Sequence, residues 1–372
     1  MKFLSQTKMW SAAGALAFGA FLTGCGGNSS SDSTNSTETT SANSATTDTT
    51  ATDSGASSDV KLTGAGATFP YPLYSKWFDT YKTKTGVEIN YASVGSGAGI
   101  KQLKSQTVDF GASDAALSDK DAAEMPSEVL HIPTVAGAVV VVYNVAGAPK
   151  NLKMSGDVLA DIFLGKITNW NDPKIGALNA GVKLPALPIT VAHRSDGSGT
   201  TNIFTTYLKS ASPNWSVIGA GKSVAWPVGV GGKGNDGVSS AVKTSKGGIG
   251  YVELAYATQN DLSYASIRNS AGQFIAPSVD ATTSAAQDGI AGLQKDIRTP
   301  IANGKGAKSY PIAGFTYILV YKKQRDAAKG KALKDFLKWS MKDGQAMGKA
   351  LQYAPLPQEV IALNDKAIDS IQ

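Results

Sequence analysis

Two long apolar runs limit what this chain can fold into. Residues 135–143 (VAGAVVVVY) and 315–321 (FTYILVY) are nearly continuous apolar stretches, rich in β-branched and aromatic side chains. Strands that are buried on both faces have such runs, whereas strands with one face in water alternate apolar and polar residues. We therefore predict two central strands, separated in the chain by a long middle segment.

Segments with helical spacing lie around these runs. The chain of 372 residues is 42% hydrophobic and 17% charged, which is enough apolar material for one or two packed domains. Residues 87–94 have the pattern of a strand. Helices are predicted at 71–81, from 100–103 onward, and at 156–163, 201–209, 238–243 and 331–347. This alternation predicts an α/β protein.

The N-terminus predicts export and lipid attachment. Lys2 and Lys8 form a basic start, and the apolar stretch at 9–21 is too short for a typical membrane-spanning helix. Residues 22–25 (LTGC) resemble a bacterial lipoprotein box, in which Cys25, the only cysteine, takes the lipid. We predict a lipoprotein signal peptide at 1–24. The alternative is an ordinary signal peptide that is cleaved elsewhere, which leaves a soluble secreted protein.

The next segment has the composition of a tether. Residues 26–59 contain no aromatic or large aliphatic side chain, so they cannot bury enough surface to offset the entropy of ordering. We predict that 25–59 is a disordered tether that holds the folded part at the membrane through the lipid on Cys25.

The charge of the chain favours a small anion as its partner. The formal net charge is +6 at pH 7, although residues 1–59 hold only two lysines against five acidic residues. The remainder is therefore more basic than the whole chain, which raises the arrival rate of any anion. Export and the scattered positions of the lysines argue against nucleic acid, and most of these lysines are interpreted as a solubilising surface.

Three Gly/Ser/Thr-rich turns follow predicted strands and precede helices: GAGATFP at 64–70, SVGSGAG at 93–99 and HRSDGSGT at 193–200. Glycine allows a tight turn, hydroxyl groups add donors, and a helix N-terminus presents unpaired N–H groups, so each turn is a candidate anion site. Alternatively, Ser198 and Thr200 are ordinary helix N-caps and the glycines are ordinary loop residues.

Two charged residues have matching roles. The guanidinium of Arg194 offers a fork of donors to an oxyanion, and Asp196 could hold that fork in place. The carboxylate of Asp114 could accept a hydrogen bond from protonated phosphate, whereas sulfate has no proton to give. The alternatives are a surface ion pair for Arg194 and a turn or N-cap role for Asp114.

Other chemistries have little support. His131 and His193 are interpreted as structural, and no metal site or cofactor is predicted. A GxGxxG pattern at Gly229, Gly231 and Gly234 is attributed to chance or to a structural loop, because the strand-turn-helix context that a nucleotide site requires is missing. A reactive pair of His193 and Ser198 is conceivable, but a local turn rarely supplies the geometry of a catalytic triad.

Six motifs, in order, resemble PstS-like phosphate-binding receptors of bacterial ABC-type phosphate importers, which belong to the periplasmic-binding-protein superfamily. The motifs are LTGAGATFPYPLYSKWFDTY, VDFGASDAALSD, LGKITNW, RSDGSGT, WPVGVGGKGNDG and GYVELAYA, and the resemblance runs from about residue 62 to residue 357. It implies an extracytoplasmic, monomeric receptor that captures inorganic phosphate and delivers it to permease subunits, and that is not an enzyme. A secreted phosphomonoesterase and a surface scaffold are the alternatives.

The resemblance also implies a fold and a set of contacts. The fold is of the two-lobed type II α/β kind, in which each lobe is a mixed sheet flanked by helices and two crossover strands join the lobes. Lobe I would comprise 60–135 and 314–372, and lobe II would comprise 136–313. The implied phosphate contacts are Thr68, Phe69, Ser96, Asp114, Arg194, Ser198, Gly199 and Thr200, with Asp196 orienting Arg194. Two departures are His193, where some relatives carry a second arginine, and Gly97, where a serine is common.

Overall fold

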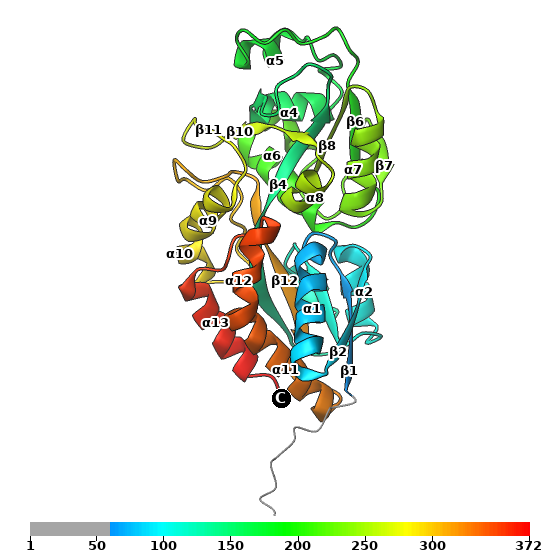
Figure 1. Cartoon of the computed structure of the whole chain (residues 1–372), viewed down its shortest axis with the longest axis vertical. Coiled ribbons are helices and arrows are strands. Elements are labelled where there is room, and N and C mark those ends of the chain that lie inside the picture. Colours follow the sequence, from blue (N-terminus) through cyan, green and yellow to red (C-terminus); the bar gives the residue numbers. More distant parts are fainter. Residues whose placement is uncertain (1–59) are drawn as a thin grey trace, which may run out of the picture. The chain divides into compact units, whose positions relative to one another are not determined.

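A computed structural model describes residues 60–372 (Figure 1). The predicted signal peptide, the lipidation site at Cys25 and the tether lie outside the described residues. Within 60–372, no helix is both long enough and apolar enough to cross a membrane.

Within these residues, nine strands form the main sheet, in the order β2-β1-β3-β12-β4-β8-β6-β7, with β9 paired to β4. A smaller sheet has the order β11-β10-β5. The strands are β1 Lys61–Gly66, β2 Glu88–Ser93, β3 Phe110–Ser113, β4 Val129–Asn144, β5 Lys153–Met154, β6 Thr190–Arg194, β7 Val230–Gly232, β8 Gly248–Glu253, β9 Ser263–Tyr264, β10 Ser266–Arg268, β11 Phe274–Ile275 and β12 Ala313–Tyr321.

Helices cover both ends of this sheet (Figure 1). They are α1 Tyr71–Thr85, α2 Ser96–Lys104, α3 Asp119–Ala123, α4 Gly156–Phe163, α5 Pro173–Leu178, α6 Gly199–Ala211, α7 Gly234–Thr244, α8 Leu254–Gln259, α9 Val279–Asp288, α10 Ile290–Leu293, α11 Ala327–Trp339, α12 Gln345–Gly348 and α13 Gln358–Asp369. Short 3₁₀ turns occupy Pro213–Val217 and Lys349–Leu351, and a π-turn occupies Ser340–Gly344.

Strand β4 changes partner part-way along its length. Up to Ala138 it pairs antiparallel with β12, and from Val139 onward it pairs antiparallel with β8. At this point the N–H of Val139 donates to the carbonyl of Ile312 at 2.8 Å, so the two chain segments still lie side by side. All of β12 and residues 132–143 of β4 are buried. The prediction of two central buried strands is confirmed, and β4 is longer than the apolar run that marks it.

The change of partner divides the main sheet into two lobes. The lower lobe in Figure 1 holds β1, β2, β3, α1, α2 and the C-terminal helices α11 to α13, and the upper lobe holds β6, β7, β8 and α4 to α8. The expected two-lobed α/β fold is confirmed. The boundaries at 135/136 and 313/314 stay a prediction, and α10, from the predicted lobe II segment, contacts α13 of the lower lobe.

Local sequence explains where helix α1 begins and ends. Proline lies in its first turn, and the following Gly86 has a left-handed φ of 77°, which stops the helix. Its buried face is Leu73, Tyr74, Trp77, Phe78 and Tyr81. The predicted helix at 71–81 is confirmed, as are those at 156–163 and 201–209.

Three helices differ from their predicted bounds. Helix α2 begins at Ser96 instead of residue 100, because Gly99 lets its backbone lie against β1: a Cβ there would stand 2.4 Å from the Gly66 Cα. Helix α7 begins at Gly234 instead of residue 238. The predicted helix at 331–347 is interrupted by the π-turn, where the indole of Trp77 donates to the Gly344 carbonyl at 2.8 Å.

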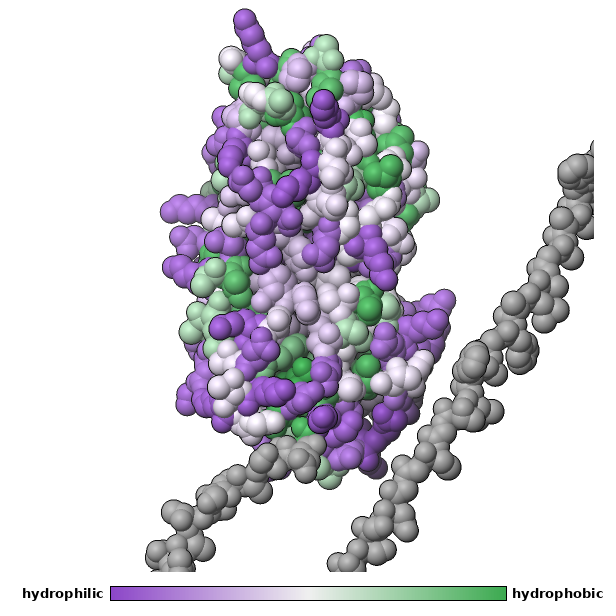
Figure 2. Space-filling model, turned by 45° about the vertical axis from the view of Figure 1, so that its right-hand side comes forward, coloured by the Kyte–Doolittle hydropathy of each residue, from purple (hydrophilic) through white to green (hydrophobic). Residues whose placement is uncertain are grey.

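On the face shown in Figure 2, hydrophobic residues form small separate patches among hydrophilic ones. The large exposed hydrophobic residues of the described chain are Tyr71, Val217 and Val230. A surface of this kind agrees with the interpretation of the scattered lysines as solubilising groups.

Candidate anion-binding site between the lobes

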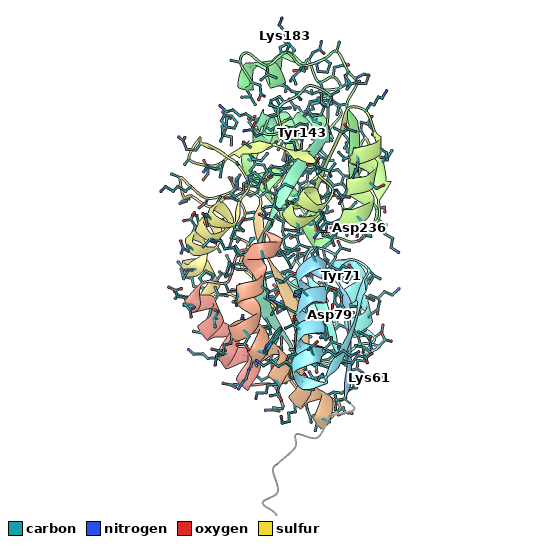
Figure 3. The ribbon with its side chains drawn as sticks, in the orientation of Figure 1. Lys61, Tyr71, Asp79, Tyr143, Lys183 and Asp236 are labelled. Carbon is teal, nitrogen blue, oxygen red and sulfur yellow. The ribbon has the colours of Figure 1, made fainter. Side chains whose placement is uncertain are left out.

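The site lies where strands of both lobes end. Strands β1, β2 and β3 are mutually parallel through β1, and β6, β7 and β8 are mutually parallel through β6, so the turns after them gather at the junction of the lobes. Tyr71, at the start of α1, and Asp236, in the first turn of α7, are labelled on either side of this junction in Figure 3.

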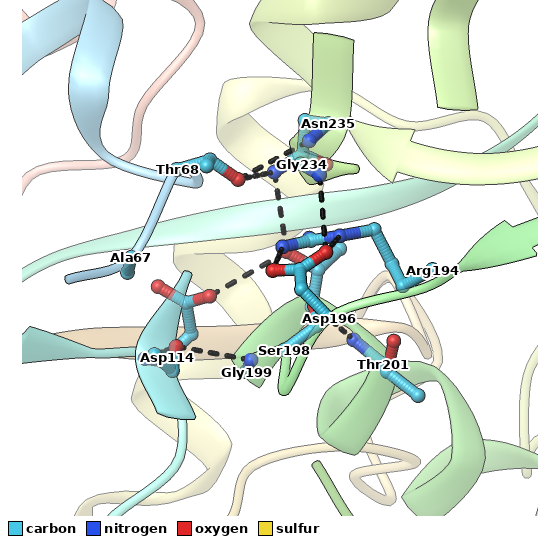
Figure 4. A network of polar contacts seen from close by, with 12 residues as sticks. Ala67, Thr68, Asp114, Arg194, Asp196, Ser198, Gly199, Thr201, Gly234 and Asn235 are labelled. Atoms are coloured by element: carbon cyan, nitrogen blue, oxygen red, sulfur yellow. Dashed lines mark hydrogen bonds and ion pairs between the residues drawn. The ribbon is translucent and has the colours of Figure 1, made fainter. Parts of the chain in front are cut away.

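Arg194, the last residue of β6, is the positive charge of the site. Its side chain is only 1% exposed, so it is not the surface ion pair that was the alternative. Its Nε donates to Asp196 Oδ1 at 2.8 Å and its Nη2 to Asp196 Oδ2 at 2.5 Å (Figure 4). The third nitrogen, Nη1, is buried and has no hydrogen-bond partner within residues 60–372. An unpaired buried donor on a cation is costly, and an anionic ligand would satisfy it.

Asp196 ties this guanidinium to a second helix. Its Oδ1 also accepts the N–H of Gly234, the first residue of α7, at 3.0 Å. Burial acts to raise the pKa of Asp196, but its hydrogen bonds with Arg194 and the nearby positive charge outweigh burial and lower the pKa. Asp196 is therefore ionised at neutral pH, and its carboxylate forms an ion pair with the guanidinium of Arg194.

Two hydroxyl groups are arranged as donors. Ser96 Oγ accepts the N–H of Gly199 at 3.0 Å and that of Asp114 at 3.3 Å. Thr68 Oγ1 accepts the N–H of Asn235 at 3.2 Å and its side-chain Nδ2 at 2.7 Å. A hydroxyl has two acceptor lone pairs and one proton, so each of these groups has only its proton left to offer.

The turn before α6 was predicted either to bind an anion or to cap the helix, and one of its two hydroxyl residues is a helix cap. Ser198 Oγ accepts the N–H of Thr201 at 3.0 Å, so Ser198 is indeed the N-cap of this helix. Its own N–H donates to the Lys222 carbonyl at 2.8 Å. Thr200 is not a cap, because it lies inside the helix, and its hydroxyl contacts Asp114 Oδ2 at 3.5 Å.

Asp114 is a buried carboxyl group facing this turn. It follows β3 and is 5% exposed, and no helix of the described chain begins directly after it, so the N-cap alternative is wrong. Thr316 Oγ1 donates to its Oδ1 at 2.9 Å. Burial raises the pKa of Asp114 to about 7, against the opposing effects of the Thr316 hydrogen bond and the Arg194 charge. A Cβ on Gly199 would stand 2.5 Å from the Asp114 Cβ, so only glycine permits this approach.

Two backbone donors complete the set. Tyr256 donates to the Thr68 carbonyl at 2.6 Å, and Tyr353 donates to the Phe69 carbonyl at 2.7 Å. The N–H groups of Thr68 and Phe69 have no hydrogen-bond acceptor within residues 60–372. The structure thus brings predicted residues of both lobes together. Ser96 and Asp114 contact the start of α6, and Thr68 and Asp196 both contact the start of α7.

Comparison with known proteins places the chain in a family. A family model described as a PBP superfamily domain matches residues 36–343. The phosphate-binding protein PstS of Xylella fastidiosa (strain 9a5c) is 47% identical over 308 residues, which cover 82% of this chain and 84% of that protein. The chain belongs to the PstS family of phosphate-binding proteins. PstS of Pasteurella multocida (strain Pm70) is 46% identical over 81% of this chain and 87% of its own length.

Solved structures support the PstS-family fold. A phosphate-binding protein from Stenotrophomonas maltophilia aligns with a TM-score of 0.66 at 22% identity, over 82% of this chain and 93% of that chain. A high-affinity periplasmic phosphate-binding protein solved with phosphate aligns with the same TM-score, over 84% and 99%. The family resemblance inferred from the six motifs is confirmed, as is the expectation of a binding protein and not an enzyme.

The sequence pattern missed one part of this PstS-family site. Strand β7 lies within the GxGxxG pattern and helix α7 begins at its last glycine, so the strand-turn-helix context of a nucleotide site is missing, as expected. Gly231 lies inside the strand instead of after it, so the pattern is not a dinucleotide-binding turn. Its last glycine, Gly234, contacts Asp196, and the next residue, Asn235, contacts Thr68. The glycine-rich sequence GGKGN at 231–235, which follows a short apolar segment, could have indicated these contacts.

The two histidines have structural contacts. His131 Nε2 accepts the N–H of Leu117 at 3.0 Å, and burial lowers the pKa of His131 to about 4. The His193 ring stacks on Trp226, and its Nδ1 lies 3.0 Å from the Arg194 carbonyl, so His193 is not paired with Ser198. Among the described residues, no group of three or more His, Cys, Asp or Glu side chains could hold a metal ion.

Proposed function

We propose that this PstS-family protein binds inorganic phosphate between its two lobes and delivers it to the permease subunits of an ABC-type importer. The observation that carries the proposal is the buried Arg194 Nη1, which has no partner within residues 60–372, in a network that also holds the hydroxyl of Thr68 and the N–H of Gly199 (Figure 4). Such a set of neutral donors around one fixed cation suits a small oxyanion.

In the proposed complex, every contacting group donates a hydrogen bond to phosphate except the Asp114 carboxylate, which accepts one. The contacts are the N–H groups of Thr68, Phe69 and Gly199, the hydroxyls of Thr68, Ser96, Ser198 and Thr200, the Arg194 guanidinium and the Asp114 carboxylate. Asp196 holds Arg194 by two hydrogen bonds and leaves Nη1 for the ligand. On binding, phosphate would replace the present contacts of the Gly199 N–H with Ser96 and of the Thr200 hydroxyl with Asp114.

Selectivity follows from Asp114. It is an acceptor among donors, so a ligand that carries a proton gains a hydrogen bond there, whereas a fully ionised oxyanion meets a negative charge. Monohydrogen phosphate has such a proton and sulfate does not. The site is therefore proposed to prefer phosphate to sulfate.

Uptake and release require the lobes to separate. In this structure the lobes contact each other at the rim, where the Gly97 N–H donates to the Gly197 carbonyl at 2.8 Å and Lys222 pairs with Asp121 at 2.7 Å. The side chains of Thr68, Ser96 and Arg194 are almost completely buried. A hinge motion about β4 and β12 would open the path for the ligand.

The location is proposed from the family and from the N-terminal sequence. The chain would act as a monomer on the extracytoplasmic side of the membrane, anchored by a lipid on Cys25 after removal of residues 1–24. Mass spectrometry of the mature protein tests the anchor: an acylated N-terminal cysteine is expected, and an unmodified Cys25 would contradict it.

Calorimetric titration of the full-length protein, dialysed free of phosphate, tests the binding function. We expect saturable binding of one phosphate, similar binding of arsenate, and sulfate binding that is weaker by at least about a hundredfold. A phosphate monoester should bind more weakly, because its organic group would have to enter a site whose Thr68, Ser96 and Arg194 side chains are almost completely buried. Hydrolysis of a chromogenic ester would contradict the receptor function, and equal binding of sulfate would contradict the role of Asp114.

A further inference from the structure

Asn235 is completely buried at the start of α7, and it contacts groups from three other segments. Its Nδ2 donates to Thr68 Oγ1 at 2.7 Å (Figure 4), and it also donates to Thr200 Oγ1 at 3.3 Å. Its Oδ1 accepts the N–H of Glu253 at 2.9 Å. Neither the family resemblance nor the composition of the turns assigns this residue a role.

The orientation of this carboxamide is fixed by its surroundings. The N–H of Glu253 can only donate, so the atom that faces it must be the carboxamide oxygen. The NH₂ group then faces the two hydroxyls, with one N–H for each of them. All hydrogen-bonding capacity of the NH₂ group is thereby used.

The contact decides what the two hydroxyls can do. Thr68 Oγ1 receives two N–H groups from Asn235, so its lone pairs are occupied and its proton must go elsewhere. Thr200 Oγ1 receives one N–H and lies 3.5 Å from the Asp114 carboxylate, to which it donates. Each hydroxyl is thus a donor on the side away from Asn235.

We infer that Asn235 is a positioning residue that sets the hydroxyls of Thr68 and Thr200 as proton donors to a bound oxyanion. It does so across the lobes, because Thr68 follows β1 in the lower lobe and Asn235 is the second residue of α7 in the upper lobe. The inference rests on the proposed function, since it explains how two freely rotating hydroxyls become suited to phosphate. An aspartate at this position would have the same shape but would accept from both hydroxyls.

The test is isothermal titration of inorganic phosphate into the full-length wild type and Asn235→Asp. The carboxylate turns both hydroxyl protons away from the ligand and adds a negative charge, so we expect Kd to rise by at least about a hundredfold at pH 8. The ratio of the two Kd values should fall as the pH is lowered to about 5.5, because a protonated carboxyl group can donate again. A ratio that does not change with pH would overturn the inference.

A double-mutant cycle tests whether Asn235 acts through Thr68. In the wild type, Thr68→Val should weaken phosphate binding about tenfold or more, and Thr68→Ser, which keeps the hydroxyl, by less than about threefold. In Asn235→Asp, the change to valine should cost less than about twofold, because that hydroxyl no longer points at the ligand. Equal costs in both backgrounds would overturn the inference. If Asn235→Asp does not fold, equal affinities of the serine and valine variants would overturn it instead.

Asn179→Asp is the matched control. Asn179, at the end of α5, is also buried, its Oδ1 accepts the N–H of Lys153, and its Nδ2 donates to two oxygens. Those oxygens are backbone carbonyls, so no hydroxyl is reoriented. The phosphate affinity of Asn179→Asp should equal that of the wild type. A loss of affinity as large as that of Asn235→Asp would overturn the inference. If the wild type itself binds no phosphate, the proposed function fails, and this inference fails with it.

Discussion

Gly97 and Gly197 face each other across the rim of the site, with the N–H of Gly97 donating to the carbonyl of Gly197 at 2.8 Å. A Cβ on Gly97 would stand 3.1 Å from the Gly197 Cα, which is closer than carbon atoms normally approach. Gly97 is the position where related receptors were expected to carry a serine. In this chain, its lack of a side chain lets the two lobes meet.

Gly97→Ala should separate affinity from stability. Alanine favours helix α2 by up to about 1 kcal/mol, so unfolding of the ligand-free protein should move to equal or higher temperature. The new methyl group presses on Gly197, so phosphate affinity should fall roughly three- to tenfold. Gly176→Ala in α5 is the control, because nothing lies within 4 Å of its Cβ position. Unchanged affinity of Gly97→Ala would show that the rim contact does not contribute to binding.

The preference for phosphate over sulfate should depend on pH through Asp114. Burial raises the pKa of Asp114 to about 7, so the group is mostly ionised above this pH and protonated below it. Once protonated, it can donate to sulfate instead of repelling it. The ratio of the sulfate Kd to the phosphate Kd should fall by at least about tenfold between pH 8.5 and 5.5. Titrations at both pH values should show a small, constant ratio for Asp114→Asn, and a constant large ratio for both proteins would contradict this role.

Asp196→Asn should destabilise the ligand-free protein. It leaves the buried guanidinium of Arg194 without its counter-charge, at a cost of about 3 kcal/mol in the free energy of unfolding. Phosphate supplies a new counter-charge, so it should raise the melting temperature more in the variant than in the wild type.

The pH dependence of this loss has a fixed sign. The pKa of Asp196 is lowered in the folded protein, so its contribution is present above the ordinary pKa of an aspartate and disappears as the pH falls through the folded value. Urea unfolding should therefore show a smaller difference between wild type and Asp196→Asn near pH 3 than at pH 7. Asp335→Asn, in the exposed pair with Lys331, is a control that should show little effect at either pH. A difference that grows on acidification would contradict the ion pair.

Glu253 is expected to carry a proton in the folded protein. Tyr353 has one hydroxyl proton, which it donates to the Phe69 carbonyl at 2.7 Å, yet its oxygen also lies 3.1 Å from Glu253 Oε2. The Oε2 atom of Glu253 also accepts the N–H of Ala255 at 2.8 Å, whereas Oε1 is buried without a hydrogen-bond partner among residues 60–372, and such an environment favours the uncharged carboxyl group. Burial raises the pKa of Glu253 well above its ordinary value, which agrees with this arrangement.

Glu253→Gln should consequently gain stability relative to the wild type as the pH rises. Below the ordinary pKa both the folded and the unfolded wild type hold the proton, but above it only the folded state does, so the wild type loses stability. The difference in the free energy of unfolding should shift towards the variant by up to about 1.4 kcal/mol per pH unit between pH 5 and 8. Urea unfolding measures it, with the exposed Glu128→Gln as control, and no shift would mean that Glu253 is ionised.

The local parts of the fold and of the site could be predicted from sequence. Continuous apolar runs revealed β4 and β12, because a strand buried on both faces has no polar positions to interrupt it. Glycine-rich turns before helices revealed the positions around Ser96 and Ser198. Arg194 and Asp196 lie two residues apart, so their pairing could be proposed without a structure.

The connecting parts could not be predicted in this way. Asn235 and Thr68 are 167 residues apart, and Thr316 and Asp114 are 202 residues apart. Periodicity indicates which residues are buried, but it does not identify the hydrogen-bond partner of a buried polar group. The start of α7 was predicted four residues late for the same reason, since the N–H of Gly234 is satisfied by Asp196 and not by a local cap.

By itself, the sequence determined the α/β class, the family resemblance and the residue types of the predicted anion site, because these depend on neighbouring residues. The tertiary structure alone decided that the lone pairs of the Thr68 hydroxyl are occupied, so that it can only donate. It also decided that burial raises the pKa of Asp114 and that Arg194 Nη1 is buried within 60–372 without a hydrogen-bond partner. Those properties depend on desolvation and on pairwise contacts between distant segments. Both exist only once the lobes have folded and met.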